Sequence, residues 1–326
     1  MKAVRLARYG ADYDGVACVE IDEPPAPGQD EVTIEIEASP IHPADLLSLA
    51  GRYATPPPLP LIPGGEACGR VVAVGAGVDH LAAGQRVIPL SRGNWVARRT
   101  VRADDVIAVP DGDPLQLAML KVVPATAHLM LTGIVPLQDG DAVIQNAANS
   151  SVGLAAARLG RRMGVTVINV VRREELIDEL VRHGAGNAFL DGSDLADRVR
   201  GAFGGVAIRL ALDAVAGEAS LRLGECLSPG GTLVSYGLLS GEPCMLRPGR
   251  AIFEGVSLTG FWLSRHIAET PRSGLEALYG ELAGLVNDGT LATPIEATYG
   301  IDEAVEAIRR AARFRRSGKI MILPGA

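Results

Sequence analysis

The chain has 326 residues and a formal net charge of −7, and charged residues make up 21% of it. At roughly 150 residues per domain this length suggests about two domains, and a hydrophobic content of 48% is ample for buried cores. The acidic balance, with no long basic run, argues against nucleic acid or an anionic membrane as a partner.

The cysteines and the apolar stretches narrow the class of protein further. Four cysteines lie far apart, at positions 18, 68, 226 and 244, which predicts neither a disulfide framework nor a zinc ribbon. The N-terminal MKAVRLARYG becomes charged too early for a signal peptide. The longest apolar stretch, 115–137, contains Lys121 and two prolines, which favours a buried helix and turn over a membrane span. We therefore expect a cytoplasmic protein without a membrane partner.

The first 110 residues alternate short apolar runs with proline and glycine. Strands are expected at 31–41, 69–75, 86–90 and 98–110. The VTIEIE segment has the period-two alternation of a half-exposed strand. This block is predicted to be a β-rich domain.

From about 120 to 262, apolar β-runs alternate with helical segments. Strands are expected at 142–147, 165–171, 187–190, 208–215 and 231–237, with helices at 151–163, 175–184, 195–203 and 217–227. Strands this apolar are buried on both faces, as in a parallel sheet covered by helices. The pattern predicts an α/β fold with a doubly wound Rossmann sheet.

The tail contains amphipathic segments at 275–289 and 301–313 and a closing strand at 318–324. We expect it to return to the β-rich domain. The nucleotide-binding domain, 119–265, would then be inserted between 1–118 and 266–326.

The sharpest local feature is AVIQNAANSSVGLAAARLG at 142–160, where an apolar strand leads through small residues into a small-residue helix. Such a turn places a dinucleotide pyrophosphate on the helix N-terminus, where free N–H groups and the helix dipole favour anions. Ala148, Ser150 and Gly153 occupy the three positions of the Gly-x-Gly-x-x-Gly pattern, so the match is partial. An ordinary strand-to-helix turn is the alternative.

The next strand ends in Arg172 and Arg173, where an acidic residue would bind the ribose of NAD and a basic one suits the 2′-phosphate of NADP. Arginine fits a phosphate because its planar fork donates two hydrogen bonds. Glu174 and Glu175 follow and weaken the local field. NADPH is the predicted cofactor, and a solvated pair of strand-end arginines is the alternative.

Taken together, VIQNAANSSVG, INVVRR and SLTGFWLS (257–264) resemble the medium-chain dehydrogenase/reductase superfamily. The closer resemblance is to its zinc-independent 2-enoyl thioester reductases, of the mitochondrial trans-2-enoyl-CoA reductase type. It also includes HPADLLSLAGRYATPPPLPLIPGGEACGRVVAVG (42–75) and VVPATAHLML (122–131), so it runs through nearly the whole chain. The resemblance implies that the β-rich domain is a GroES-like, partly open barrel.

No metal is predicted. The zinc-holding relatives carry a Gly-His-Glu motif, which here reads Gly64-Gly65-Glu66. His42 lies near another ligand position, but Cys68 is shifted and no partner is evident. The two or three matched nitrogen and sulfur ligands that a zinc site needs are therefore missing.

The resemblance implies that Tyr53 stands at the position of the family's catalytic tyrosine. Hydride addition to Cβ of an enoyl thioester builds negative charge on the thioester oxygen, and a phenol can donate a hydrogen bond there or protonate Cα. The substrate is then an enoyl thioester of coenzyme A or of acyl-carrier protein. A half-packed loop tyrosine is the alternative.

The resemblance also assigns cofactor contacts. The turn of Asn149, Ser150, Ser151 and Val152 would hold the pyrophosphate, although Ser151 stands where relatives commonly have glycine. Arg172, Arg173 and Glu174 would surround the ribose phosphate. The nicotinamide half would lie along Tyr236, Gly237, Leu238, Leu239, Phe261, Trp262, Leu263 and Ser264, with Lys319 as a further contact. Phe261 and Trp262 could instead be core residues, and Lys319 a surface charge.

Two other functions on the same fold stay open. One is an NADPH:quinone or enone oxidoreductase, and the other is a catalytically idle protein that binds NADPH. A homodimer formed through the last strand of the nucleotide-binding sheet, around 255–262, is expected by analogy with the fold.

Overall fold

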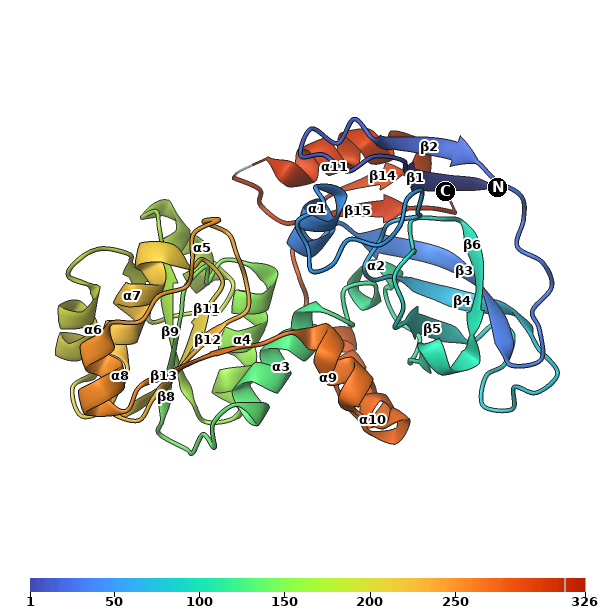
Figure 1. The fold of residues 1–326 in the computed structure, drawn as a ribbon. Coiled ribbons are helices and arrows are strands. Elements are labelled where there is room, and N and C mark those ends of the chain that lie inside the picture. Colours follow the sequence, from blue (N-terminus) through green and yellow to red (C-terminus); the bar gives the residue numbers. More distant parts are fainter. Residues whose placement is uncertain (314, 326) are drawn as a thin grey trace. The chain divides into compact units, whose positions relative to one another are not determined.

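The computed structural model describes residues 1–313 and 315–325. The chain forms two compact units, one made of residues 1–122 with the residues from 267 on, and one of residues 123–266 (Figure 1). One helix, α9 (Leu263–Glu269), begins in the second unit and ends in the first. The fold class predicted from the sequence, a parallel-sheet domain inserted into a β-rich domain, is confirmed.

A seven-stranded sheet organises the first unit, in the order β14-β15-β3-β4-β5-β7 with β6 paired to β3. Its strands are β3 (Glu31–Pro40), β4 (Cys68–Val74), β5 (Arg86–Pro89), β6 (Arg98–Arg102), β7 (Val106–Ala108), β14 (Ile295–Gly300) and β15 (Lys319–Leu323). A hairpin of β1 (Lys2–Leu6) and β2 (Val16–Glu20) lies apart from this sheet. The helices are α1 (Pro43–Leu49), α2 (Pro114–Leu117), α10 (Arg272–Asn287) and α11 (Ala304–Ala312).

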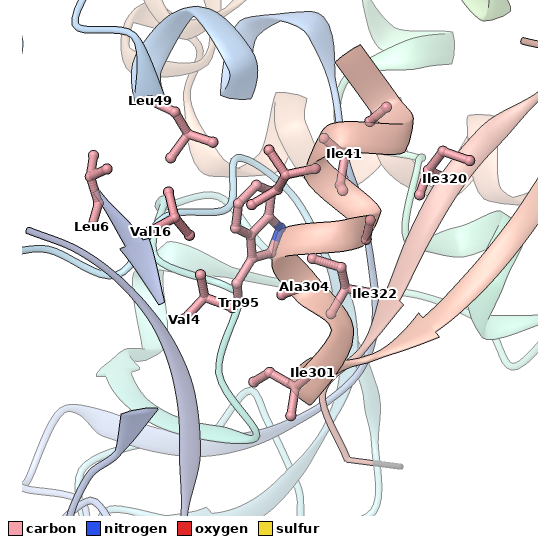
Figure 2. Packing of buried hydrophobic residues seen from close by; sticks show 13 residues of the cluster. Val4, Leu6, Val16, Ile41, Leu49, Trp95, Ile301, Ala304, Ile320 and Ile322 are labelled. Carbon is pink, nitrogen blue, oxygen red and sulfur yellow. The ribbon is translucent and has the colours of Figure 1, made fainter. Parts of the chain in front are cut away.

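The tail is held in the first unit by the apolar face of α11. Ala304, Ala307, Ile308 and Ala311 recur at helical spacing and are buried, which places them on one face. They pack in a cluster around Trp95, together with apolar residues of β1 and β15 (Figure 2). Segments from both ends of the chain therefore share one core.

A six-stranded parallel sheet forms the centre of the second unit, in the order β10-β9-β8-β11-β12-β13. Its strands are β8 (Ala142–Gln145), β9 (Thr166–Val171), β10 (Ala188–Leu190), β11 (Ile208–Asp213), β12 (Thr232–Ser235) and β13 (Ser257–Gly260). The helices are α3 (Val123–Gly133), α4 (Ser151–Arg162), α5 (Glu175–Arg182), α6 (Leu195–Phe203), α7 (Gly217–Cys226) and α8 (Pro248–Glu254).

Alternation along β9 shows how both faces of this sheet are covered. Val167 and Val171 pack with α4 and α5, whereas Ile168 and Val170 pack with α6 and α7. Successive side chains of a strand point to opposite faces, so each face has its own apolar layer. The continuous run of apolar residues in the sequence follows from this burial on both sides.

Several expected elements differ in extent from the observed ones. The single strand expected at 98–110 is divided into β6 and β7 by a 3₁₀ turn at Ala103–Asp105. The β1–β2 hairpin, α1, β14 and α8 lie in segments for which the sequence predicted no regular structure. All of these are short, so they offer little periodicity to recognise.

Candidate functional site

The turn after β8 has the features of a phosphate cradle. Ser150 is the N-cap of α4, and its hydroxyl accepts a hydrogen bond from the Gly153 N–H at 3.1 Å. Gly153 has no space for a side chain, because a Cβ there would lie 2.5 Å from the Ala148 carbonyl oxygen. The close approach of helix and strand therefore requires glycine. The first amides of a helix have no partner within it and can bind an anion.

Tyr236 supplies a polar group beside this turn. Its hydroxyl is buried near the Ser150 side chain and has no well-formed hydrogen bond to any described residue. Burial, with the nearby Asp213 carboxylate, raises the pKa of Tyr236 above its ordinary value, so the hydroxyl stays protonated. A buried hydroxyl without a partner is costly, and a ligand oxygen at the N-terminus of α4 would satisfy it.

The predicted cofactor residues of the second unit follow the carboxyl ends of four strands of one parallel sheet. The cradle follows β8, Arg172 and Arg173 follow β9, Tyr236 follows β12, and Phe261 follows β13. Ligands of open α/β sheets bind at this edge. The topology therefore brings these residues to one edge of one sheet.

Individual residues on this edge differ in what they can offer. Arg172 and Glu174 are exposed, whereas Arg173 forms an ion pair with Glu175 at 2.8 Å. Arg172 is the more exposed of the two arginines, so it is the better candidate for a ribose phosphate.

The nicotinamide-side residues are divided between exposed and buried positions. Leu238, Leu239 and Trp262 are exposed. Gly237 has no room for a Cβ, which would lie 2.6 Å from the Ala214 carbonyl oxygen. Phe261 is only 7% exposed and stacks on His266, with ring centroids 4.6 Å apart. The buried residues Val152 and Phe261 can offer backbone contacts to a ligand more readily than side-chain contacts. Asn149, Ser151 and Leu263 are half-buried and Ser264 is exposed.

Tyr53 lies in the first unit, just after α1. Gly51 ends that helix with a positive φ of 69°, and the Arg52 N–H donates to the Leu47 carbonyl at 2.8 Å. This turn fixes the backbone that leads into Tyr53, whose side chain is half-buried. The guanidinium carbon of Arg92 lies 5.4 Å from the centroid of the Tyr53 ring.

A cluster of buried charges in the same unit contains Glu66, Lys121 and Lys319. Glu66 is fully buried; its Oε2 accepts a hydrogen bond from the Val122 N–H at 2.9 Å, and its Oε1 has no partner among the described residues. Lys121 donates to the Gly65 carbonyl at 2.7 Å, and the Tyr279 hydroxyl donates to the Lys121 carbonyl at 3.2 Å. Sequence analysis found Lys319 but assigned no role to Glu66 or Lys121.

Burial sets the ionisation of this cluster. It raises the pKa of Glu66 to about 7, and the two ammonium groups and the Val122 amide oppose that rise. It lowers the pKa of Lys121 and Lys319 to about 8, and the carboxylate of Glu66 opposes that fall. His42 accepts the Ala44 N–H through Nδ1 at 3.2 Å, and burial together with Lys319, Arg92 and Arg316 lowers its pKa. It is therefore a neutral imidazole near pH 7.

These residues do not fit a zinc site. A Cβ at Gly65 would lie 2.9 Å from Asp45 Oδ1 and 3.5 Å from Arg92 Nη1, so the place of the motif's histidine is filled by an ion pair. Lys121 and Lys319 add positive charge that a divalent cation would have to face. Within residues 1–313 and 315–325, no three His, Cys, Asp or Glu side chains are grouped to hold a metal. The same part of the chain has no helix long and apolar enough to span a bilayer.

Comparison with known proteins gives the relationships of the chain. A model of the alcohol dehydrogenase GroES-like domain matches residues 28–111, and a model of the zinc-binding dehydrogenases matches residues 151–278. The mitochondrial enoyl-[acyl-carrier-protein] reductase of Bos taurus is 35% identical over 301 residues, which cover 89% of this chain and 81% of the bovine protein.

Two solved structures are also similar. A mycobacterial quinone oxidoreductase has a TM-score of 0.87 and 27% identity, and the match covers 99% of this chain and 100% of that one. The structure of the Etr1p/NADP/crotonyl-CoA complex has a TM-score of 0.86 over 99% of both chains. At 23% identity, the second likeness shows the shared fold.

Proposed function

This chain belongs to the medium-chain dehydrogenase/reductase superfamily, among its zinc-independent enoyl thioester reductases, and we propose that it reduces trans-2-enoyl thioesters with NADPH. The observation that carries the proposal is the 35% identity with an enoyl-[acyl-carrier-protein] reductase over most of both chains. The edge of the parallel sheet in the second unit and Tyr53 in the first supply groups that suit this chemistry.

The second unit would bind the cofactor. The N-terminus of α4, with Asn149, Ser150 and Ser151, would receive the pyrophosphate, and the Tyr236 hydroxyl would donate to one of its oxygens. Arg172 would bind the 2′-phosphate that distinguishes NADPH from NADH. The residues after β12 and β13, which include Leu238 and Trp262, would line the nicotinamide half. When bound, NADPH supplies the hydride that adds to Cβ of the substrate.

Tyr53 would stabilise the negative charge of the reaction or supply its proton. As Cβ receives the hydride, negative charge grows on the thioester oxygen, and a phenol hydroxyl can donate a hydrogen bond to it or a proton to Cα. Losing one such donor typically costs roughly 10²- to 10³-fold in rate. A zinc ion as the electrophile is disfavoured by the ion pair that fills the space at Gly65. Lys319, beside the Glu66 carboxylate, would add a positive charge for the cofactor or the substrate.

The 27% identity with a mycobacterial quinone oxidoreductase favours one alternative, reduction of quinones or enones by NADPH. A quinone accepts the hydride without a thioester oxygen to stabilise, so this reaction would depend less on Tyr53. The two substrates therefore separate the two functions.

The test is NADPH oxidation followed at 340 nm with crotonyl-CoA, a longer trans-2-enoyl-CoA, an enoyl-acyl-carrier protein and a simple quinone. We expect thioester turnover, reduced roughly 10²-fold or more by Tyr53→Phe, with Tyr299→Phe as a control in the same unit. Turnover of the quinone alone would refute the proposal. NADPH-dependent thermal stabilisation without any turnover would instead indicate a protein that only binds the cofactor.

The edge of the parallel sheet also supports a homodimer, which we include in the proposal. Strand β13 pairs with β12 on one side only, and all four of its residues are exposed. Ile252 and Phe253 of the preceding helix α8 are exposed as well, at 70% and 84%. An unpaired strand edge flanked by exposed apolar side chains is suited to pair with the same edge of a second copy.

A further inference from the structure

Arg92 contacts the ring of Tyr53, and the proposed reaction gives this contact no role. Its guanidinium carbon lies 5.4 Å from the centroid of the Tyr53 ring, within the range of a cation–π contact. Arg92 follows β5 in the chain, whereas Tyr53 follows α1, so the sheet of the first unit brings two distant segments together. The contact is made to the side chain for which the sequence predicts the catalytic role.

Hydrogen bonds to α1 hold the guanidinium of Arg92. Its Nη2 donates to Asp45 Oδ1 and to Ser48 Oγ, each at 3.0 Å. Asp45 is itself fixed, because its side chain is only 1% exposed and its Oδ2 accepts the His42 N–H at 2.9 Å. The Ser48 hydroxyl donates to the Ala44 carbonyl at 2.8 Å. The position of Arg92 is thus set by two side chains of α1.

Gly65 makes this arrangement possible. A side chain at position 65 would meet Asp45 Oδ1 at 2.9 Å and Arg92 Nη1 at 3.5 Å from its Cβ. Glycine leaves room for the ion pair at the position where the zinc-holding pattern has histidine. The guanidinium of Arg92 is therefore a fixed positive charge next to Tyr53. It lies where a histidine side chain at position 65 would not fit.

We propose that Arg92 is a positioning residue for Tyr53: it holds the ring in one orientation and draws electron density from it, which makes the hydroxyl a stronger hydrogen-bond donor. This inference rests on the proposed function, since it assigns Arg92 a role through the tyrosine of that reaction. A cation–π contact at a partly exposed site corresponds to about a two- to fivefold change in rate.

The test is a double-mutant cycle of Arg92→Met and Tyr53→Phe, with kcat and KM measured for crotonyl-CoA and NADPH. Arg92→Met is expected to lower kcat about two- to fivefold and to leave the KM for NADPH unchanged. In the Tyr53→Phe background it is expected to have no further effect, because the hydroxyl through which it acts is gone. An equal loss of kcat in both backgrounds would overturn the proposal.

Two further variants separate positioning from stability. Arg98→Met is the matched control. Arg98 is 45% exposed and ion-paired, and Arg92 is 44% exposed and ion-paired. Arg98 differs in that it lies on β6 and pairs with Glu35 of β3. It should leave kcat unchanged. Arg92→Lys keeps a charge beside Asp45 but loses the planar fork, so it should fold if Arg92→Met does not, and should restore only part of the rate.

A readout that needs no turnover keeps this inference distinct from the proposed function. The ring resonances of the six tyrosines can be followed by NMR, with Tyr53 assigned from Tyr53→Phe. We expect Arg92→Met to shift the Tyr53 signals and Arg98→Met to leave them in place. If the wild-type enzyme reduces no thioester, the proposed function fails. If the Tyr53 signals do not respond to Arg92→Met, the inference fails whatever the substrate.

Discussion

Glu66→Gln tests the buried charge cluster of the first unit, because it removes the carboxylate and keeps the shape of the side chain. Glu66 is fully buried, and the neighbouring ammonium groups of Lys121 and Lys319 both depend on its charge. The nearby carboxylate of Asp45 is already paired with Arg92 at 3.0 Å. The variant would leave two buried cations without a carboxylate of their own. However, burial raises the pKa of Glu66 from 4.5 to about 7 even with both ammonium groups nearby, so ionised Glu66 costs the folded state about 3 kcal/mol near pH 7. Glutamine does not ionise, so we expect Glu66→Gln to gain about 3 kcal/mol in the free energy of unfolding at pH 7.

The pH dependence gives the sign of the effect. In the wild type, burial raises the pKa of Glu66 from 4.5 to about 7, so between these values the folded state binds more protons and stability falls as pH rises. Glu66→Gln removes this fall. Without the carboxylate, the pKa of Lys121 and Lys319 in the folded state drops further, whereas unfolded lysine titrates near about 10.4. The unfolded variant then binds more protons, so its stability should rise from pH 7 to pH 9.

The assay is urea unfolding monitored by far-UV circular dichroism at several pH values from 5 to 9. Glu35→Gln is the matched control, since Glu35 is 41% exposed and paired with Arg98, and should change stability by less than about 1 kcal/mol. Adding Lys121→Met to Glu66→Gln should raise the stability further at pH 7, because one uncompensated buried cation is gone. If Glu66→Gln is no more stable than the wild type at pH 7 and has the same pH dependence, burial does not perturb this carboxylate and the reasoning is wrong.

Two predictions concern the second unit. Arg172→Ala should lower kcat/KM for NADPH about tenfold, as expected for the loss of a charge-assisted hydrogen bond, and leave kcat/KM for NADH unchanged; Arg182→Ala on α5 is the control, and equal losses with both cofactors would contradict the role of Arg172. Phe253→Asp should convert a dimer into a monomer in size-exclusion chromatography with light scattering, because it places a charge on the exposed apolar surface beside β13. A wild-type protein that is monomeric at high micromolar concentration would contradict this surface as an interface.

The parallel sheet could be predicted from the sequence because burial on both faces leaves a simple signal. Each of its strands from β8 to β12 is a short apolar run bounded by polar residues or glycine, and each is followed by a helix or a loop. Once the strands are known to be parallel, their carboxyl ends must lie on one edge. The joint location of Ser150, Arg172 and Tyr236 on that edge therefore follows from the order of residues alone.

The charged sites of the first unit could not be predicted in this way. Asp45 and Arg92 are 47 residues apart, and Glu66 and Val122 are 56 apart, and no periodicity connects them. They meet because the strands of a mixed sheet return along different paths, which the sequence does not state. Lys121 stood out inside an apolar stretch, but the interpretation of that stretch as a buried helix and turn gave the lysine no partner.

The position of Gly65 connects these sites. Compared with the Gly-His-Glu motif of the zinc-holding relatives, Gly64-Gly65-Glu66 lacks the histidine ligand. In the structure Asp45 and Arg92 occupy the space that a side chain at this glycine would need, and the glycine carbonyl accepts a hydrogen bond from the Lys121 ammonium. Restoring histidine at this position would displace the ion pair and place an imidazole among cations, so it would not recreate a metal site. The absence of the ligand and the presence of a cation beside Tyr53 are therefore one structural feature, and the coupling between Arg92 and Tyr53 measures whether it serves the reaction.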